Sequence, residues 1–116
     1  MIKTRKQQTI QRIYNKEKKH AFDLYDLKEF DGISNKLKQF SYVELEPNEE
    51  VAFHMHEGNT ENYYIIKGKG LYNDNGKEMR VGDGDVTFTP SGHGHALKNV
   101  GTEKLSFIAL VIINDW

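Results

Sequence analysis

The sequence contains no cysteine in a chain of 116 residues. This absence excludes a disulfide framework, a thiolate metal site and a cysteine nucleophile together. Any metal that the protein binds must therefore be held by nitrogen and oxygen ligands. A chain of this length has room for one domain, which can bury a single core without cross-links.

Long hydrophobic runs and a large net charge are also missing. The longest apolar run, residues 107–113, has seven residues, whereas a membrane-spanning helix needs roughly 20. The basic start of the chain is not followed by the apolar segment of a signal peptide, so we expect cytoplasmic residence and no membrane partner. With 16 basic and 17 acidic residues the net charge is −1, which argues against nucleic acid as a partner.

The charge is unevenly distributed along the chain. Residues 1–20 hold seven basic residues and one acidic residue, whereas the remainder holds 9 basic and 16 acidic residues. We therefore expect a basic N-terminal arm or edge strand at residues 1–20 and a single β domain at residues 21–116. The arm is predicted to pack on this domain or on a second subunit, because it has few aromatic residues and no known nucleic-acid-binding fold.

Short strand patterns separated by turn sequences fill the rest of the chain. Turn residues recur between them at intervals that are typical of an antiparallel sandwich or barrel. The predicted strands are residues 22–27, 37–45, 51–56, 61–67, 69–72, 78–81, 85–89, 95–100 and 105–113. We therefore predict one all-β domain.

The last predicted strand is apolar on both faces from Phe107 onward, whereas a strand with one wet face would alternate. An exposed segment of this kind would be prone to aggregation. We expect the strand to lie between the two sheets, with part of it or of a neighbouring strand at a homodimer interface. Burial of both faces within one chain is the alternative.

Histidines concentrate in two short stretches, residues 54–56 and 93–95. Residues i and i+2 of a strand point to the same face, so His54 and His56 can converge on one ion. A four-residue loop then returns the chain and places Glu61 across from His56. Two imidazoles and one carboxylate suit a borderline divalent metal, although a His-x-His pair alone is more often two solvated side chains.

These residues belong to a longer pattern of fixed spacing. The first string is His54, one residue, His56, four residues, Glu61, six residues and Gly68. The second string is Gly84, five residues, Pro90, one residue, Gly92, two residues, His95, three residues and Asn99. The two strings resemble the paired motifs of the cupin superfamily over about residues 37–113. One position differs from the motif of the family, because Asn48 stands where the first motif usually begins with glycine. Asparagine tolerates the left-handed backbone of such a turn.

The resemblance implies an all-β fold, an antiparallel jelly-roll β-barrel or double-stranded β-helix, with metal ligands in its mouth. His54, His56 and Glu61 match the ligands of the first motif, and His95 matches the ligand of the second. Four ligands leave two adjacent octahedral positions for water, substrate or dioxygen. The implied cofactor is one divalent transition metal per chain. Manganese is the first expectation, by resemblance to oxalate decarboxylases and germin-type oxalate oxidases, while iron, nickel, zinc, cobalt and copper accept the same ligands.

The other motif residues are predicted to shape the barrel. Gly68, Gly84 and Gly92 are expected at turns that need positive φ or a close backbone approach, and Pro90 is expected to end a strand. Asn99 is expected to bind backbone groups of a neighbouring turn.

A substrate pocket follows from strand alternation. If Glu61 faces inward, then Tyr63 and Ile65 share its face, and Leu97 shares the face of His95. A mostly apolar pocket with one hydroxyl suits a small organic acid, enol or phenol. Ordinary barrel packing is the simpler role for Tyr63.

The resemblance implies a metal-binding single-domain cupin that holds a small carboxylate, with activity like that of an oxalate decarboxylase if it acts on its ligand. The alternatives are a metal-dependent dioxygenase of the quercetinase kind, a non-catalytic sensor or binding barrel, and a sugar isomerase or epimerase, which would need more polar or basic groups than the inferred inner faces show. No general acid or base is assigned. Glu57 and His93 are near the ligands in sequence, and both are expected to be solvated.

Overall fold

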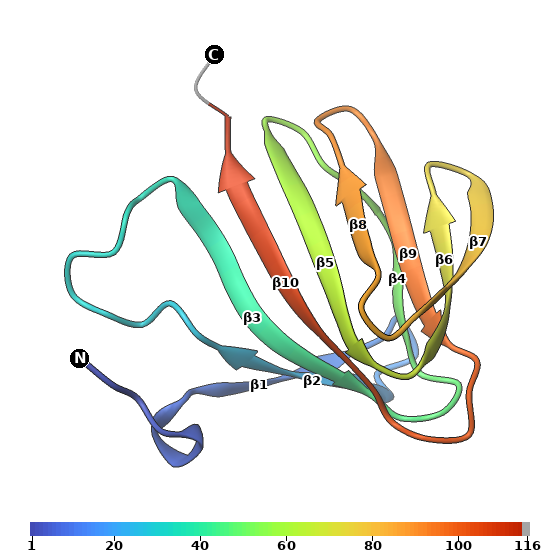
Figure 1. The fold of residues 1–116 in the computed structure, drawn as a ribbon, viewed down its shortest axis with the longest axis horizontal. Coiled ribbons are helices and arrows are strands. Elements are labelled where there is room, and N and C mark those ends of the chain that lie inside the picture. The colour runs from blue at the N-terminus through green and yellow to red at the C-terminus, as the bar shows by residue number, and fades with distance from the viewer. Residues whose placement is uncertain (115–116) are drawn as a thin grey trace.

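The computed structural model describes residues 1–114, and ten β-strands make up most of that part of the chain (Figure 1). The strands are β1 (Ile10–Tyr14), β2 (His20–Asp26), β3 (Leu37–Leu45), β4 (Glu50–Met55), β5 (Asn59–Lys67), β6 (Lys69–Asp74), β7 (Lys77–Gly82), β8 (Val86–Thr89), β9 (Gly94–Asn99) and β10 (Leu105–Ile113). The nine predicted strands are all present, each with ends within two residues of the prediction. The final two residues of the predicted 21–116 domain lie outside the described part.

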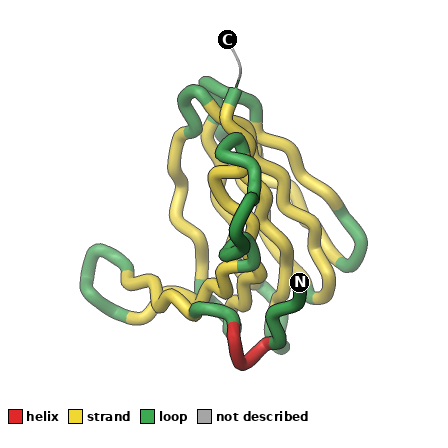
Figure 2. The backbone as a smooth tube through the Cα atoms, turned by 90° about the vertical axis from the view of Figure 1, so that its left-hand side faces the viewer, coloured by secondary structure: helices red, strands yellow, loops and turns green. Residues whose placement is uncertain are grey.

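The strands form two antiparallel sheets that face each other (Figures 1 and 2). The larger sheet has the order β1-β2-β3-β10-β5-β8, and the smaller sheet has the order β4-β9-β6-β7. From β3 to β6, and again from β7 to β10, successive strands alternate between the two sheets. This connectivity confirms the predicted all-β jelly-roll fold and is consistent with a double-stranded β-helix, although the two ladders do not join into one closed sheet.

The core lies between the sheets and follows the two-residue period of the strands. In β3 the buried residues are Ser41, Val43 and Leu45, and in the neighbouring β10 every second residue from Leu105 to Val111 is buried. The apolar cluster consists of Phe22, Val43, Leu45, Tyr63, Ile65, Tyr72, Leu97, Leu105, Phe107 and Ala109. Because both sheets contribute to it, burial of this cluster holds them face to face.

Within the described residues, other strands bury the inner face of β10 but leave its outer face partly exposed. It lies between β3 and β5 in the larger sheet, and its inward side chains belong to the core. On its outer face Ile108 and Leu110 are half-buried, and Ile112 is 37% exposed. The expectation that this strand lies between the two sheets is therefore wrong, because β10 is an inner strand of the larger sheet. Its outer face is only partly buried within the described residues, and a cover from a second copy stays a prediction.

The N-terminal residues pack along the larger sheet. Residues 10–14 form its edge strand, β1, which pairs with β2. The Arg5 guanidinium lies 4.3 Å from the ring centre of Tyr25 and 4.6 Å from that of Tyr42, a cation–π arrangement that holds the arm against the sheet. Within residues 1–114, no helix is long and apolar enough to cross a membrane.

The turn residues of the motifs behave as predicted. Asn48 has a φ of 71° and Gly92 a φ of 88°, both in the left-handed region. Strand β8 ends directly before Pro90. The buried Asn99 side chain donates to the carbonyls of Leu45 and Glu103, at 2.9 and 2.8 Å, and so fastens the turn that follows β9.

Gly68 is required for two reasons, backbone conformation and close packing. Its φ is 121°, and a Cβ atom built there would lie 2.7 Å from the Leu105 Cα atom. Gly32 also has a positive φ, 83°, but a Cβ atom there would meet nothing within 4 Å. An alanine at position 32 therefore meets only the unfavourable backbone conformation, whereas an alanine at position 68 meets both that conformation and a steric clash.

We expect Gly68→Ala to lower the free energy of unfolding by about 2 kcal/mol more than Gly32→Ala, because a clash with backbone adds to the cost of positive φ. Urea unfolding at one protein concentration measures both variants. Equal losses would show that the approach of β10 to this turn adds no constraint.

Candidate metal centre

Strands β4, β5 and β9, with the residue just after β4, bring four side chains to one place between the sheets: His54, His56, Glu61 and His95. The pairing of β4 with β9 sets His54 directly opposite His95 in the smaller sheet. Glu61 comes from β5 in the larger sheet and faces them across the interior. His56, Glu61 and His95 are buried, and His54 is half-buried. The four residues predicted as ligands therefore do converge.

A bulge in β4 is needed for this convergence. Val51 pairs with Leu97 and His54 pairs with His95, so two residues of β4 span the same interval as one residue of β9. The extra residue changes the alternation, and both Val51 and His54 line the interior as a result. Phe53 consequently faces outward, where it is 49% exposed.

His56 lies just beyond β4 and is held by the loop that precedes β9. The His56 amide donates to the His93 carbonyl at 2.9 Å, and the Gly92 amide donates to the His56 carbonyl at 2.7 Å. The glycine of the second motif thus fixes a ligand of the first. The His93 side chain is exposed, as predicted, and only its backbone takes part.

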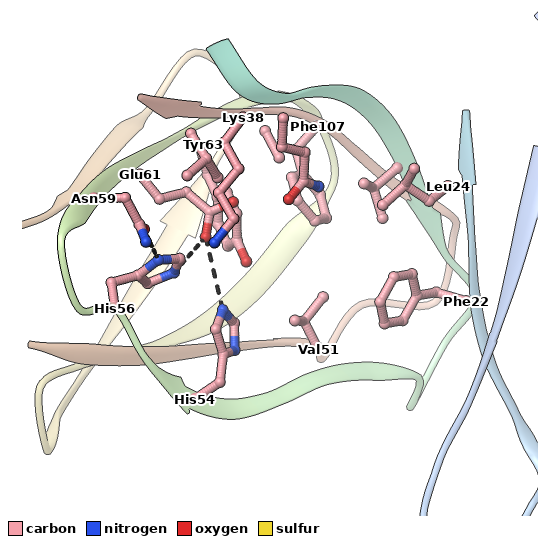
Figure 3. Close-up of a pocket in the computed structure, with 14 residues that line it drawn as sticks. Phe22, Leu24, Lys38, Val51, His54, His56, Asn59, Glu61, Tyr63 and Phe107 are labelled. Atoms are coloured by element: carbon pink, nitrogen blue, oxygen red, sulfur yellow. Dashed lines mark hydrogen bonds and ion pairs between the residues drawn. The ribbon is translucent and has the colours of Figure 1, made fainter. Parts of the chain in front are cut away.

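The four candidate ligand atoms all lie within 4.8 Å of one another. Figure 3 shows three of the four residues, His54, His56 and Glu61, with the contacts of both histidines to Glu61 as dashed lines. Glu61 Oε1 is 2.8 Å from the Nε2 atoms of His56 and His95 and 3.7 Å from that of His54. The Nε2 atom of His95 is also 3.1 Å from that of His54 and 3.2 Å from that of His56.

The other ring nitrogen of each histidine has a partner of its own. His56 Nδ1 is 2.6 Å from Asn59 Oδ1, and His54 Nδ1 is 2.8 Å from the Ala52 carbonyl. Both oxygens can only accept, so each Nδ1 atom is the donor and carries the proton. In a neutral ring the Nε2 lone pair then points at the shared centre.

His95 is held in the same way by hydroxyl groups. Its Nδ1 atom lies 2.8 Å from the Tyr72 hydroxyl and 2.9 Å from that of Thr89, and either hydroxyl oxygen can accept a hydrogen bond from it. Its ring also stacks on Tyr63, with ring centres 4.7 Å apart and an interplanar angle of 26°. Packing and hydrogen bonding together fix the direction of its Nε2 atom.

The charges of the site favour an ionised carboxylate beside a neutral imidazole. Burial acts to raise the pKa of Glu61, but hydrogen bonds and charges from the surrounding histidines outweigh it and lower the pKa from 4.5 to about 2. Burial lowers the pKa of His95, and the hydrogen bond to Glu61 raises the pKa of His54. These hydrogen bonds to Glu61 need protons on the inner ring nitrogens when no cation is bound, and a bound cation would take the place of those protons. The three imidazoles and the carboxylate are therefore a donor set able to hold a metal cation.

A cavity of about 240 Å³ opens onto this cluster. It is lined by Phe22, Leu24, Lys38, Gln39, Val43, Val51, His54, His56, Asn59, Glu61, Tyr63, Phe107, Ala109 and Val111, ten of which Figure 3 labels. The wall is mainly apolar, and its polar groups are three residues of the cluster together with Lys38, Gln39, Asn59 and the Tyr63 hydroxyl. A space of this size suits a ligand of few atoms, because pockets for drug-sized molecules run from about 300 to 1,000 Å³.

The predicted substrate pocket coincides with this cavity only in part. Tyr63 lines it, whereas Ile65 and Leu97 are fully buried in the core and do not. Strand alternation correctly places both on the inner face, but it carries no information on depth along a strand. Glu57 is exposed and does not line the cavity either.

Three polar residues of the cavity, Lys38, Gln39 and Asn59, were not predicted. Asn59 lies at the start of β5 and accepts the Nδ1–H of His56, a role that no spacing rule signals. Lys38 lies near the start of β3, and its position depends on a bulge that the sequence pattern does not reveal.

Comparison with known proteins agrees with the fold and the motif. Residues 41–113 match the Cupin domain family. A protein of Thermotoga maritima named oxalate-binding protein is 41% identical over 83 residues, which cover 72% of this chain and 69% of that protein.

Solved structures agree as well. The crystal structure of a predicted oxalate decarboxylase of Thermotoga maritima superposes with a TM-score of 0.88 at 35% identity, over 98% of this chain and 100% of that chain. An RmlC-like cupin of Shewanella frigidimarina shares the fold alone, with a TM-score of 0.76 at 17% identity, over 97% of this chain and 89% of that chain. With the paired motifs, the converging histidines and these relatives in agreement, the chain belongs to the cupin superfamily.

Proposed function

We propose that this protein is a metal-dependent binder of a small carboxylate such as oxalate. The observation that carries the proposal is the cavity itself, which is small, mainly apolar and ends on His54, His56 and Glu61. The oxalate-binding relative supports the choice of ligand. The ligands would be His54, His56, Glu61 and His95.

The residues present fit a divalent transition metal. Three imidazole nitrogens and one carboxylate oxygen are borderline donors, and each histidine has a hydrogen-bond partner on its other nitrogen. Manganese is the first metal to test because of the resemblance to oxalate decarboxylases. When bound, such an ion would supply positive charge and Lewis acidity toward a carboxylate.

The cavity favours binding over turnover. Conversion of oxalate to formate and carbon dioxide requires a proton at the new C–H bond, and so a proton donor near the ligand. Among the described residues that line the cavity, Glu61 is the one carboxyl group, and its pKa of about 2 keeps it ionised. The Lys38 ammonium also lines the cavity, but an ammonium group is a much weaker acid than a carboxyl group. Burial raises the pKa of Tyr63 well above 10, so this hydroxyl retains its proton.

The test is calorimetric titration of manganese-loaded protein with oxalate. We expect saturable binding by the loaded protein, none by protein treated with a chelator, and none by His56→Ala under the same conditions. Oxalate incubated with the loaded protein should yield no more formate and carbon dioxide than oxalate incubated with manganese alone. Oxalate binding that survives metal removal would contradict the proposal, as would its absence from loaded protein. Formate production above that control would show that the protein is a decarboxylase and not only a binder. Oxygen uptake would indicate an oxidase or oxygenase.

We also infer that the protein forms a homodimer through the outer face of the larger sheet. On that face β5, β8 and β10 present what we call the outer apolar face: Tyr64, Ile66, Val86, Phe88, Ile108, Leu110 and Ile112. None of these side chains is charged, so a second copy can meet the same surface without like-charge repulsion. The two-sided apolar character of β10 supports the same inference.

Phe88→Glu should convert the dimer to a monomer, because it places like charges against each other across a two-fold axis. Met79→Glu is the matched control, since Met79 is similarly exposed on the smaller sheet. Sedimentation equilibrium should give twice the 13.4 kDa chain mass for the parent and the control, and one chain mass for Phe88→Glu. A monomeric parent, or a dimer that tolerates Phe88→Glu, would refute this interface.

A further inference from the structure

Lys38 occupies a β-bulge in β3. Val111 of β10 pairs with Gln39 and Ile112 pairs with Leu37, so Lys38 is an extra residue with no partner across the ladder. A bulge of this kind redirects a side chain. Gln39 already faces inward, in step with the buried Ser41 to which it donates a hydrogen bond, and the bulge turns the adjacent Lys38 to the same cavity.

The Lys38 side chain extends into the cavity from its mouth. In Figure 3 it runs from β3 toward the side on which the histidines and Glu61 meet. Lys38 is exposed, so its ammonium group is reached from solvent. Within the described part of the chain it makes no hydrogen bond or ion pair, including none within 4.0 Å of Glu61. An ammonium group aimed into a pocket without a partner is available to an anion.

The net charge of the metal-loaded cavity favours a doubly charged anion as its ligand. Apart from the histidines, the ionisable side chains with a formal charge among its described lining residues are Glu61 and Lys38, and His54 and His56 would bind a metal as neutral rings. A divalent metal, one carboxylate and one ammonium leave two positive charges in a mainly apolar space. A dicarboxylate neutralises both, whereas a monocarboxylate leaves one uncompensated.

We propose that Lys38 is the specificity residue of the pocket and that the ligand is a small dicarboxylate. The Lys38 ammonium binds the part of the ligand that faces the mouth, while the four-residue cluster binds the inner part through its metal. This inference rests on the proposed function and deepens it, because it names the group that separates a dicarboxylate from a monocarboxylate of the same size.

Oxalate and glycolate test this assignment as a pair, since both offer two oxygen donors on a two-carbon frame but differ by one charge. We expect Lys38→Met to weaken oxalate binding by about 10-fold or more and glycolate binding by less than about 3-fold, because only oxalate loses a charge-assisted hydrogen bond. Lys38→Arg should keep oxalate affinity near that of the parent. Calorimetry on manganese-loaded proteins gives the affinities, and elemental analysis gives the metal content.

Lys98→Met is the control for a general loss of positive charge, because Lys98 is exposed on β9 and does not line the cavity. It should change neither affinity. Unchanged oxalate affinity in Lys38→Met, an equal loss for both ligands, or loss of metal from that variant would each overturn the role of Lys38 and leave the proposed function standing. A parent protein that binds neither ligand would overturn both.

Discussion

Three imidazole nitrogens and one ionised carboxylate oxygen share a few ångströms of buried space, and the rest of the site is arranged around that requirement. The protons on the outer ring nitrogens of His54 and His56 are held by acceptors, Ala52 and Asn59, which leaves two inner lone pairs facing Glu61. Such a group is costly to bury unless a cation or extra protons balance it. The low pKa of Glu61 shows how strongly the surrounding histidines stabilise its charge.

Much of this arrangement could be predicted because it follows from strand periodicity and motif spacing. The two-residue period places His54 and His56 on one face, and the short loop returns the chain so that Glu61 faces them. His95 required the resemblance to a family, since no local pattern connects it with residues 39 positions earlier. Strand β3 was predicted to the residue because turn sequences border it, and β10 because a long apolar run marks it.

The features of the site that could not be predicted arise where a β-bulge interrupts the alternation of side chains along a strand. The bulge of β4 turns Val51 and His54 to one side, and the bulge of β3 turns Lys38 into the cavity. Neither has a signature in the sequence, because a bulge is set by the register of the partner strand. Depth along a strand is likewise set by tertiary packing, which is why Ile65 and Leu97 lie in the core while Tyr63 reaches the cavity. Local propensity also did not distinguish an edge strand from an extended arm at residues 10–14.

The central claim is that the hydrogen bonds on the outer nitrogens prepare this cluster to hold a cation. Its most direct test is manganese affinity, measured by competition with a chelator on untagged protein and on Asn59→Ala. The account predicts one ion per chain in the parent and an affinity about 10- to 100-fold lower in the variant, which loses the acceptor for His56 Nδ1–H. Folded parent protein that takes up no divalent ion, or an Asn59→Ala variant with unchanged affinity, would contradict it.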